Sequence, residues 1–128
     1  MPTTDALFLL VEDEPLIRMM LEETLEDAGS KTVVATNGQQ ALAELETEPE
    51  RFRAVITDIR LGRGPDGWEV ARRARELVRR MPVVYVSGDS AYEWEVKGVP
   101  NSVMVSKPFL PAQVVTALAT LLNRADVR

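Results

Sequence analysis

Five short apolar runs recur along the chain, and after each of them the apolar residues repeat at helical spacing. The runs cover residues 6–11, 32–35, 54–57, 82–87 and 102–105. They are continuous, which is typical of strands that are buried on both faces of a sheet. Strands of this kind that alternate with amphipathic helices predict an α/β, doubly wound domain, with a five-stranded parallel sheet between two layers of helices.

Helix signals lie between the apolar runs. Two of the helical segments begin with the spacing of a capping box, Asn37 with Gln40 and Asp66 with Glu69. Residues 89–100 form the weakest segment, because a glycine and a proline interrupt its pattern, and it can form at most about two helical turns. We therefore expect its backbone amides to exchange faster than those of the third helical segment.

Length and charge limit the classes of protein that fit. The chain has 128 residues, so we expect one domain over residues 1–128, with a core of about 6–124 and no output domain after it. The formal net charge of −5 argues against direct contact with nucleic acid, which favours basic surfaces. The third helical segment still carries an arginine-rich outer face, which we interpret as solvated rather than as a docking surface: Arg72, Arg73, Arg75, Arg79 and Arg80.

Missing residue types restrict the chemistry further. The sequence contains no Cys and no His, which excludes disulfides, thiolate zinc sites and most catalytic triads. Any bound metal must have oxygen ligands, which points to Mg²⁺, Mn²⁺ or Ca²⁺. The N-terminus lacks the pattern of a signal peptide, and no apolar stretch is long enough to span a membrane. We therefore expect a cytoplasmic protein with no membrane contact.

Polar residues stand where the apolar runs end. Glu12 and Asp13 follow the first run, Asp58 the third, Ser87 closes the fourth, and Lys107 follows the fifth. In a doubly wound sheet the carboxyl ends of the strands meet at one edge, where ligands bind. We therefore expect three carboxylates, a hydroxyl and an amine to converge there.

This set of groups suits phosphoryl chemistry. Crowded carboxylates repel one another, and a hard divalent cation, Mg²⁺ or Mn²⁺, relieves that repulsion. A carboxylate beside the metal can act as a nucleophile and form an aspartyl phosphate, and we assign this role to Asp58. Lys107 supplies a positive charge for a phosphoryl oxygen, and Ser87 supplies a hydroxyl group.

At this point the residues resemble a known family, the receiver domains of two-component response regulators. The resemblance extends from about residue 7 to residue 122 and rests on the order and spacing of several motifs rather than on any one of them. It implies a flavodoxin-like fold with strand order 2-1-3-4-5. The matching motifs are Val11-Glu12-Asp13-Glu14, Asp58, Asp66-Gly67-x-Glu69, Ser87-Gly88 and Lys107-Pro108-Phe109.

The resemblance assigns metal ligands. Asp58 is similar to the family's phosphoacceptor, and Asp13 to a direct metal ligand. Glu12 is similar to a residue that binds the metal directly or through water. The backbone carbonyl of Arg60 would complete the metal shell.

The resemblance also assigns a phosphate-binding and signalling route, with one departure. Lys107 matches the phosphate-binding lysine, and its bond to Pro108 is cis in the family. Ser87 matches the hydroxyl residue that follows the phosphoryl group. Three positions before the lysine, where the family usually has a switching aromatic residue, this chain has Met104, which is flexible and apolar. A subclass of single-domain receivers also lacks this aromatic residue.

The resemblance implies a stand-alone phosphoacceptor with no substrate of its own. A sensor histidine kinase or a histidine phosphotransfer protein would donate the phosphoryl group, and an unknown downstream protein would respond. The oligomeric state stays open, with a homodimer as one option. A haloacid-dehalogenase-like phosphatase is disfavoured, because it needs an acid two residues after the nucleophile and this chain has Arg60 there. The remaining alternative is a non-phosphorylated receiver-like interaction module.

Overall fold

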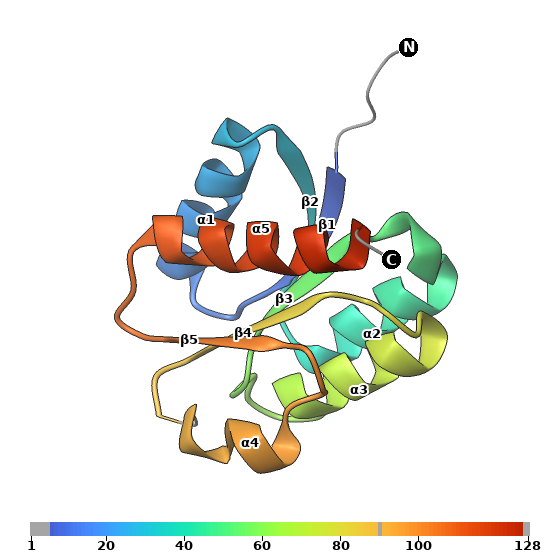
Figure 1. Ribbon diagram of the computed structural model, residues 1–128. Coiled ribbons are helices and arrows are strands. Elements are labelled where there is room, and N and C mark those ends of the chain that lie inside the picture. The colour runs from blue at the N-terminus through green and yellow to red at the C-terminus, as the bar shows by residue number, and fades with distance from the viewer. Residues whose placement is uncertain (1–5, 90, 127–128) are drawn as a thin grey trace.

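The computed structural model describes residues 6–89 and 91–126, and it contains one parallel sheet of five strands in the order β2-β1-β3-β4-β5. The predicted fold class and strand order are therefore confirmed (Figure 1). The elements follow the chain as β1 (Ala6–Val11), α1 (Pro15–Asp27), β2 (Ser30–Ala35), α2 (Gly38–Thr47), β3 (Ala54–Asp58), α3 (Gly67–Leu77), β4 (Val83–Ser87), α4 (Trp94–Lys97), β5 (Val103–Ser106) and α5 (Pro111–Asp126). Short 3₁₀ turns cover Pro49–Arg51 and Ala91–Glu93.

Two apolar cores lie on opposite faces of the sheet. Leu21 of α1 and Leu118 of α5 belong to one core, and Leu45 of α2 and Val70 of α3 belong to the other. In Figure 1, α1 and α5 accordingly cover one face, and α2 and α3 the other. Every residue of β3 and β4 is buried, which explains why these runs are continuously apolar.

The helix caps form as the sequence predicts, with one difference. Asp66 and Glu69 make both bonds of a capping box at the start of α3. The Asn37 side chain accepts a hydrogen bond from the backbone N–H of Gln40 at 2.8 Å, but the Gln40 side chain accepts from the backbone of Thr36 instead. No helix in the described part of the chain is long and apolar enough to cross a membrane.

The α4 region is short, as expected, but side-chain hydrogen bonds hold it to β4 and β5. The helix has four residues. Trp94 Nε1 donates to Ser102 Oγ at 2.8 Å, and Ser102 Oγ donates to the carbonyl of Val99 at 2.6 Å. The backbone N–H of Val99 donates to the hydroxyl of Tyr85 on β4 at 3.0 Å. These bonds fix the loop between α4 and β5, while the expected fast amide exchange of this region stays a prediction.

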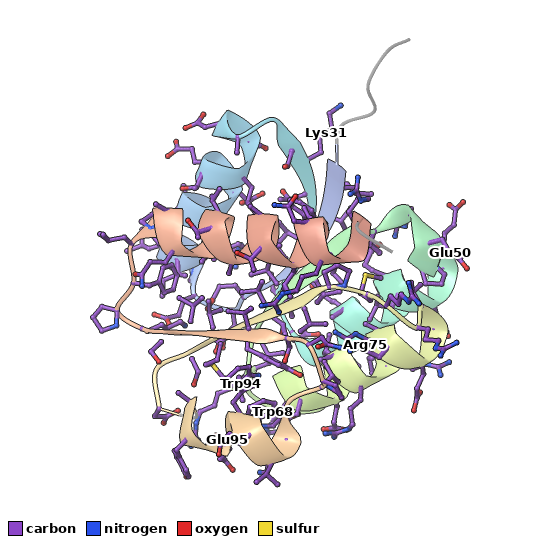
Figure 2. The ribbon with its side chains drawn as sticks, viewed as in Figure 1. Lys31, Glu50, Trp68, Arg75, Trp94 and Glu95 are labelled. Carbon is purple, nitrogen blue, oxygen red and sulfur yellow. The ribbon has the colours of Figure 1, made fainter. Side chains whose placement is uncertain are left out.

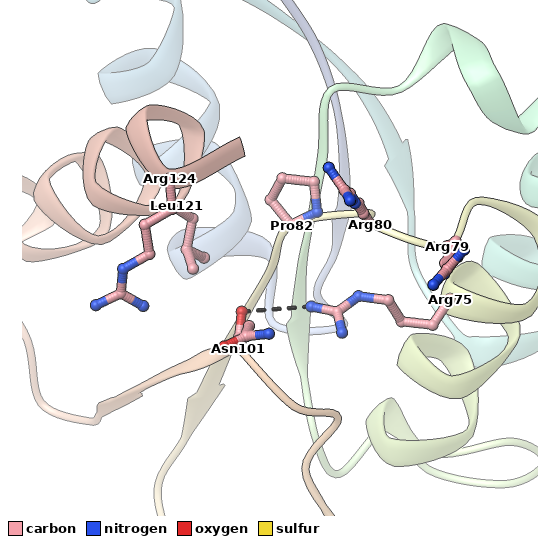
Figure 3. Close-up of a pocket in the computed structure, with 7 residues that line it drawn as sticks. All are labelled: Arg75, Arg79, Arg80, Pro82, Asn101, Leu121 and Arg124. Carbon is pink, nitrogen blue, oxygen red and sulfur yellow. Dashed lines mark hydrogen bonds between the residues drawn. The ribbon is translucent and has the colours of Figure 1, made fainter. Parts of the chain in front are cut away.

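The interpretation of the arginine-rich face of α3 as wholly solvated is wrong for Arg75. For contrast, the charged side chains of Lys31 and Glu50 extend outward in Figure 2, and both residues are exposed. Arg75 is instead half-buried, and its Nε donates to the carbonyl of Met81 at 2.6 Å. Its two terminal nitrogens donate to the carbonyls of residues 100 and 101, the latter marked in Figure 3. Sequence periodicity does not predict these bonds, because their acceptors precede β5, far along the chain.

Candidate functional site

The carboxyl ends of β1, β3 and β5 bring Glu12, Asp58 and Lys107 together. Lys107 Nζ lies 3.0 Å from Asp58 Oδ2 and 3.5 Å from Glu12 Oε1. It also lies 3.2 Å from Glu14 Oε1. One ammonium group therefore faces three carboxylates at the predicted edge of the sheet.

Backbone geometry holds Asp58 rigidly. Its Oδ1 accepts a hydrogen bond from the backbone N–H of Ile59 at 2.7 Å, and the residue is only 6% exposed. The first residue of α3, Gly67, donates its N–H to the carbonyl of Ile59 at 2.8 Å. A side chain at Gly67 would overlap the backbone carbonyl of Asp58. A glycine is needed here because α3 starts directly against the backbone of Asp58 and Ile59.

Glu12 is a buried carboxylate with incomplete hydrogen bonding. It is fully buried, and its Oε2 accepts from the backbone N–H of Glu14 at 3.2 Å. Its Oε1 has no hydrogen-bond partner among the described residues. Burial, reinforced by the nearby charge of Asp58, raises the pKa of Glu12 to about 7. The Lys107 ammonium, 3.5 Å away, forms an ion pair with this oxygen but no hydrogen bond, so its lone pairs suit a cation ligand.

Lys107 is positioned by a cis peptide bond and by the end of β4. The Lys107–Pro108 bond is cis, as the resemblance implies, and the backbone N–H of Lys107 donates to the carbonyl of Ser87 at 2.7 Å. Burial lowers the pKa of Lys107, but the carboxylates of Asp58, Glu12 and Glu14 outweigh burial and raise it. The ammonium form is therefore the stable one in this pocket.

The acidic residues that meet differ in one respect from the predicted set. Carboxylate oxygens of Glu12, Glu14 and Asp58 lie within 4.8 Å of one another. Asp13 is exposed and does not belong to this group. These carboxylate oxygens, among them the buried Glu12 Oε1 that accepts no hydrogen bond from the described residues, fit a hard divalent cation. The sequence pattern marks Glu14 only as the residue beyond the two predicted ligands.

Ser87 and Arg60 border the pocket. Ser87 is 1% exposed, and its Oγ accepts from the backbone N–H of Asp89 at 3.2 Å. The Nε of Arg60, two residues after Asp58, donates to Asp89 Oδ1 at 2.8 Å. Both partners of this ion pair are largely exposed, so it links the loops after β3 and β4 with little effect on stability.

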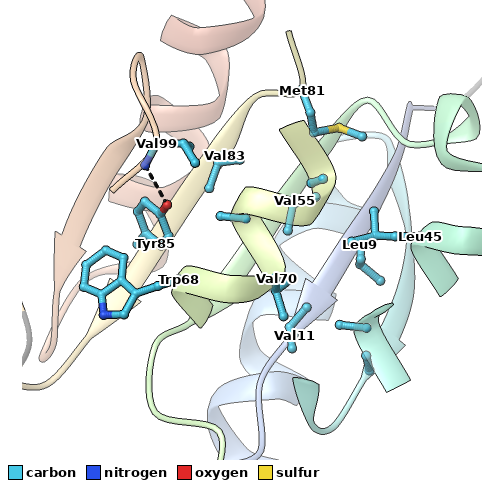
Figure 4. Packing of buried hydrophobic residues seen from close by; sticks show 14 of the residues in the cluster. Leu9, Val11, Leu45, Val55, Trp68, Val70, Met81, Val83, Tyr85 and Val99 are labelled. Carbon is cyan, nitrogen blue, oxygen red and sulfur yellow. Dashed lines mark hydrogen bonds between the residues drawn. The ribbon is translucent and has the colours of Figure 1, made fainter. Parts of the chain in front are cut away.

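Tyr85 occupies the buried space beside the switch position. It pairs with Met104 in the register of β4 and β5. Its ring is fully buried against Trp68, with centroids 4.9 Å apart and planes at 56° (Figure 4). Besides packing in the core, Tyr85 accepts a hydrogen bond at its hydroxyl from the backbone N–H of Val99. An aromatic side chain is thus present, but on the neighbouring strand and held in place at its hydroxyl.

Comparisons with known proteins agree with this geometry. The model of the response regulator receiver domain family matches residues 8–119. A response regulator receiver protein from Sinorhizobium medicae has a similar structure, with a TM-score of 0.90 and 43% sequence identity over 93% of this chain and 95% of that chain. The chemotaxis response regulator CheY4 of Vibrio cholerae has a TM-score of 0.80 and 27% identity over 92% of this chain and 99% of that chain.

Curated relatives differ in length from this chain. The alkaline phosphatase synthesis transcriptional regulatory protein PhoP of Bacillus subtilis is 27% identical over 93% of this chain, but the match covers only 49% of PhoP. The chain thus spans about half the length of relatives of this kind. The response regulator receiver protein CpdR of Brucella abortus is 31% identical over 91% of this chain, and the match covers 97% of CpdR.

Proposed function

The chain belongs to the family of response regulator receiver domains, and from this premise we propose that it is a cytoplasmic phosphoacceptor switch with no separate substrate. The donor is the phosphohistidine of a sensor histidine kinase or of a histidine phosphotransfer protein, and the acceptor is Asp58. The observation that carries the proposal is the Asp58 carboxylate, which is nearly buried and lies 3.0 Å from Lys107 Nζ. A carboxylate of this kind can act as the nucleophile in phosphoryl transfer.

The contacts of Asp58 support different roles for its two oxygens. Oδ1 accepts from the Ile59 N–H, whereas Oδ2 faces the Lys107 ammonium. Oδ2 attacks the phosphorus, a new P–O bond forms, and the P–N bond of the donor breaks with its electron pair returning to the imidazole. The transfer spreads negative charge over the phosphoryl oxygens. Lys107 is placed to neutralise one of them.

The acidic cluster supports a bound Mg²⁺ or Mn²⁺. Glu12 and Asp58 would hold the ion together with Glu14 or Asp13, and the Arg60 carbonyl would complete the shell. The ion supplies positive charge for the incoming phosphoryl oxygens. Burial, and then the charge of Asp58, raise the pKa of Glu12, and a cation here would favour its charged form. The pocket is therefore arranged to accept both a cation and a phosphoryl group.

The response to phosphorylation starts at Ser87, whose hydroxyl lies at the end of β4 next to the acceptor strand. We assign it to the phosphoryl oxygen that faces β4. The signal then passes to α4 and β5, with Met104 in place of the family's aromatic switch. A downstream protein, or a second copy of the chain, reads the changed face, and water later removes the phosphoryl group.

Metal-dependent labelling tests the proposal. The protein is incubated with acetyl phosphate and Mg²⁺ and weighed by intact mass spectrometry, beside Asp58→Asn and the matched surface control Asp27→Asn. We expect one phosphoryl group on the wild type and on Asp27→Asn, and none on Asp58→Asn. Equal labelling of Asp58→Asn would contradict the assignment of the acceptor. A folded wild type that stays unlabelled would instead favour the receiver-like interaction module, which Met104 at the switch position also suits.

A pair of substitutions identifies the additional metal ligand. Asp13→Asn and Glu14→Gln each remove one negative charge next to Glu12. The variant that loses more Mg²⁺ affinity identifies the side chain that binds the ion. The acidic cluster in the structure contains Glu14, which favours Glu14 as the additional ligand. The family resemblance favours Asp13 instead.

A further inference from the structure

A cavity lined by arginines lies at the edge of the sheet opposite Asp58. Its volume is about 330 Å³. It is bounded by the C-terminal ends of α3 and α5 and by the residues that precede β4 and β5 (Figure 3). Four of its lining residues are cationic and two are apolar: Arg75, Arg79, Arg80, Arg124, Pro82 and Leu121.

The positive charge in this cavity is not neutralised by the described residues. Arg75 is held by three backbone carbonyls, which are neutral acceptors and leave its charge in place. Arg79, Arg80 and Arg124 are exposed, and among the side chains that the structure describes, residues 7–89 and 91–124, no carboxylate forms an ion pair with any of the four. The concentration of uncompensated cations is notable in a chain with a net charge of −5.

A nearby arginine shows that α3 can pair its cations when they face its neighbours. Arg73 on the same helix forms ion pairs with Glu46 of α2 and with Glu76. The arginines that line the cavity come from α3, from the turn after it and from α5. Their convergence without acidic partners favours an external anion.

We propose that this cavity binds a compact ligand that carries a diphosphate group, of the class of the nucleoside diphosphates. Planar guanidinium groups match phosphate oxygens in pairs of hydrogen bonds, and they also stack on planar rings. The volume lies in the range of small-ligand sites, which begins at roughly 300 Å³. Pro82 and Leu121 offer an apolar wall for the part of the ligand that carries no charge.

The cavity suits a small ligand better than a protein segment. An acidic peptide needs an extended groove, whereas these residues line one half-open cavity of about 330 Å³. Arg75 is fixed in advance by its carbonyl acceptors, so little side-chain freedom is lost when the anion binds. The site lies at the amino ends of the strands and shares no residue with the Asp58 pocket, so it does not depend on the proposed phosphotransfer.

Amide chemical-shift titrations of the full chain in metal-free buffer test the proposal. The probes are ADP, inorganic pyrophosphate and, as a neutral control, adenosine. We expect ADP and pyrophosphate to cause saturable shifts at Met81, Asn101 and Leu121, and adenosine to cause none. Tighter binding of ADP than of pyrophosphate assigns the apolar wall to the nucleoside, whereas equal affinities assign the site to the diphosphate group alone. Both outcomes support a diphosphate site.

A charge-matched pair of double variants makes the test specific. Arg79→Gln/Arg124→Gln removes two cavity arginines, and Arg63→Gln/Arg72→Gln removes two exposed arginines outside the cavity. We expect the first to weaken binding at least about tenfold and the second less than about twofold. Labelling of Asp58 by acetyl phosphate should be the same in both variants, which shows that they are folded.

Three results would overturn the proposal. The first is the absence of saturable shifts with either diphosphate probe at about 10 mM, a concentration far above the dissociation constants of most specific sites. The second is equal weakening in the two double variants, which would indicate non-specific charge attraction. The third is a set of shifts centred on Lys107 rather than on the arginine cavity. If, in the first case, a glutamate-rich peptide binds the cavity while neither diphosphate does, the ligand of this site is a protein segment and not a small molecule.

Discussion

Replacing Tyr85 by Phe removes one hydroxyl group and leaves the rest of the core unchanged. The ring stays against Trp68, so the packing of the fully buried side chain is preserved. The change eliminates the acceptor of the Val99 backbone N–H, which is 3.0 Å from the hydroxyl in a buried environment. Val99 then carries a buried donor without a partner.

The expected loss follows from that unpaired donor. Leaving a buried backbone N–H unsatisfied costs about 1–3 kcal/mol, more than the net gain of an ordinary hydrogen bond. With a urea dependence of about 2 kcal/mol per M for a domain of this size, the midpoint of unfolding should fall by about 0.5–1.5 M. The slope itself should not change, because the same surface is exposed on unfolding.

Urea unfolding followed by circular dichroism measures the effect, and Tyr92→Phe is the matched control. Tyr92 is 81% exposed, so its substitution should change the unfolding free energy by less than about 0.5 kcal/mol. Amide exchange of Val99 should also become faster in Tyr85→Phe but not in the control. A midpoint for Tyr85→Phe equal to that of Tyr92→Phe would refute the reasoning, because it would mean that Val99 has another acceptor.

Three further substitutions test other contacts. Glu12→Gln should raise the free energy of unfolding at pH 8 without metal by about 1 kcal/mol, because it removes a buried, repelled charge. It should also weaken Mg²⁺ binding at least about tenfold. Urea midpoints and a Mg²⁺ titration measure the two effects, and an unchanged Mg²⁺ affinity would exclude Glu12 as a ligand. Arg75→Gln should lower the free energy of unfolding, measured in urea, by about 2 kcal/mol, since three carbonyls lose a charged donor. Substitution of the exposed Arg72 by Gln should lower it by less than about 0.5 kcal/mol. Similar losses in the two variants would count against a stabilising role for the carbonyl contacts of Arg75. Gly67→Ala should lower the free energy of unfolding by at least about 2 kcal/mol and slow labelling by acetyl phosphate, because its methyl group would overlap the backbone carbonyl of Asp58. Gly88→Ala has open space around it and should keep wild-type stability. A tolerated Gly67→Ala would contradict the close approach of α3.

The agreement between sequence and structure is closest where the cause is local. The continuous burial of β3 and β4 appears in the sequence as unbroken apolar runs. The capping box at Asp66 and Glu69 needs only a spacing of three residues, so it can be predicted from the sequence alone. The positions of Asp58 and Lys107 follow as well, because parallel strands bring their carboxyl ends to one edge.

Predictions become wrong or incomplete where a side chain meets a distant partner. The periodicity of α3 places Arg75 on a solvated face, but two of the three carbonyls that it binds precede β5, more than twenty residues away. Glu14 joins the acidic cluster through its proximity to Asp58 at the end of β3, and it also contacts Lys107, which follows β5. A long, flexible side chain reaches partners that its own neighbours in sequence do not reveal.

The sequence alone determines the five strand–helix units and the edge of the sheet where Asp58 and Lys107 meet, because apolar periodicity and strand ends are properties of consecutive residues. The tertiary structure decides which carboxylates share Lys107, where the Tyr85 hydroxyl finds its donor, and how arginines from α3 and α5 meet in one cavity. Each of these depends on distances between residues far apart in the chain. Those distances exist only after the sheet has brought its strands and covering helices together.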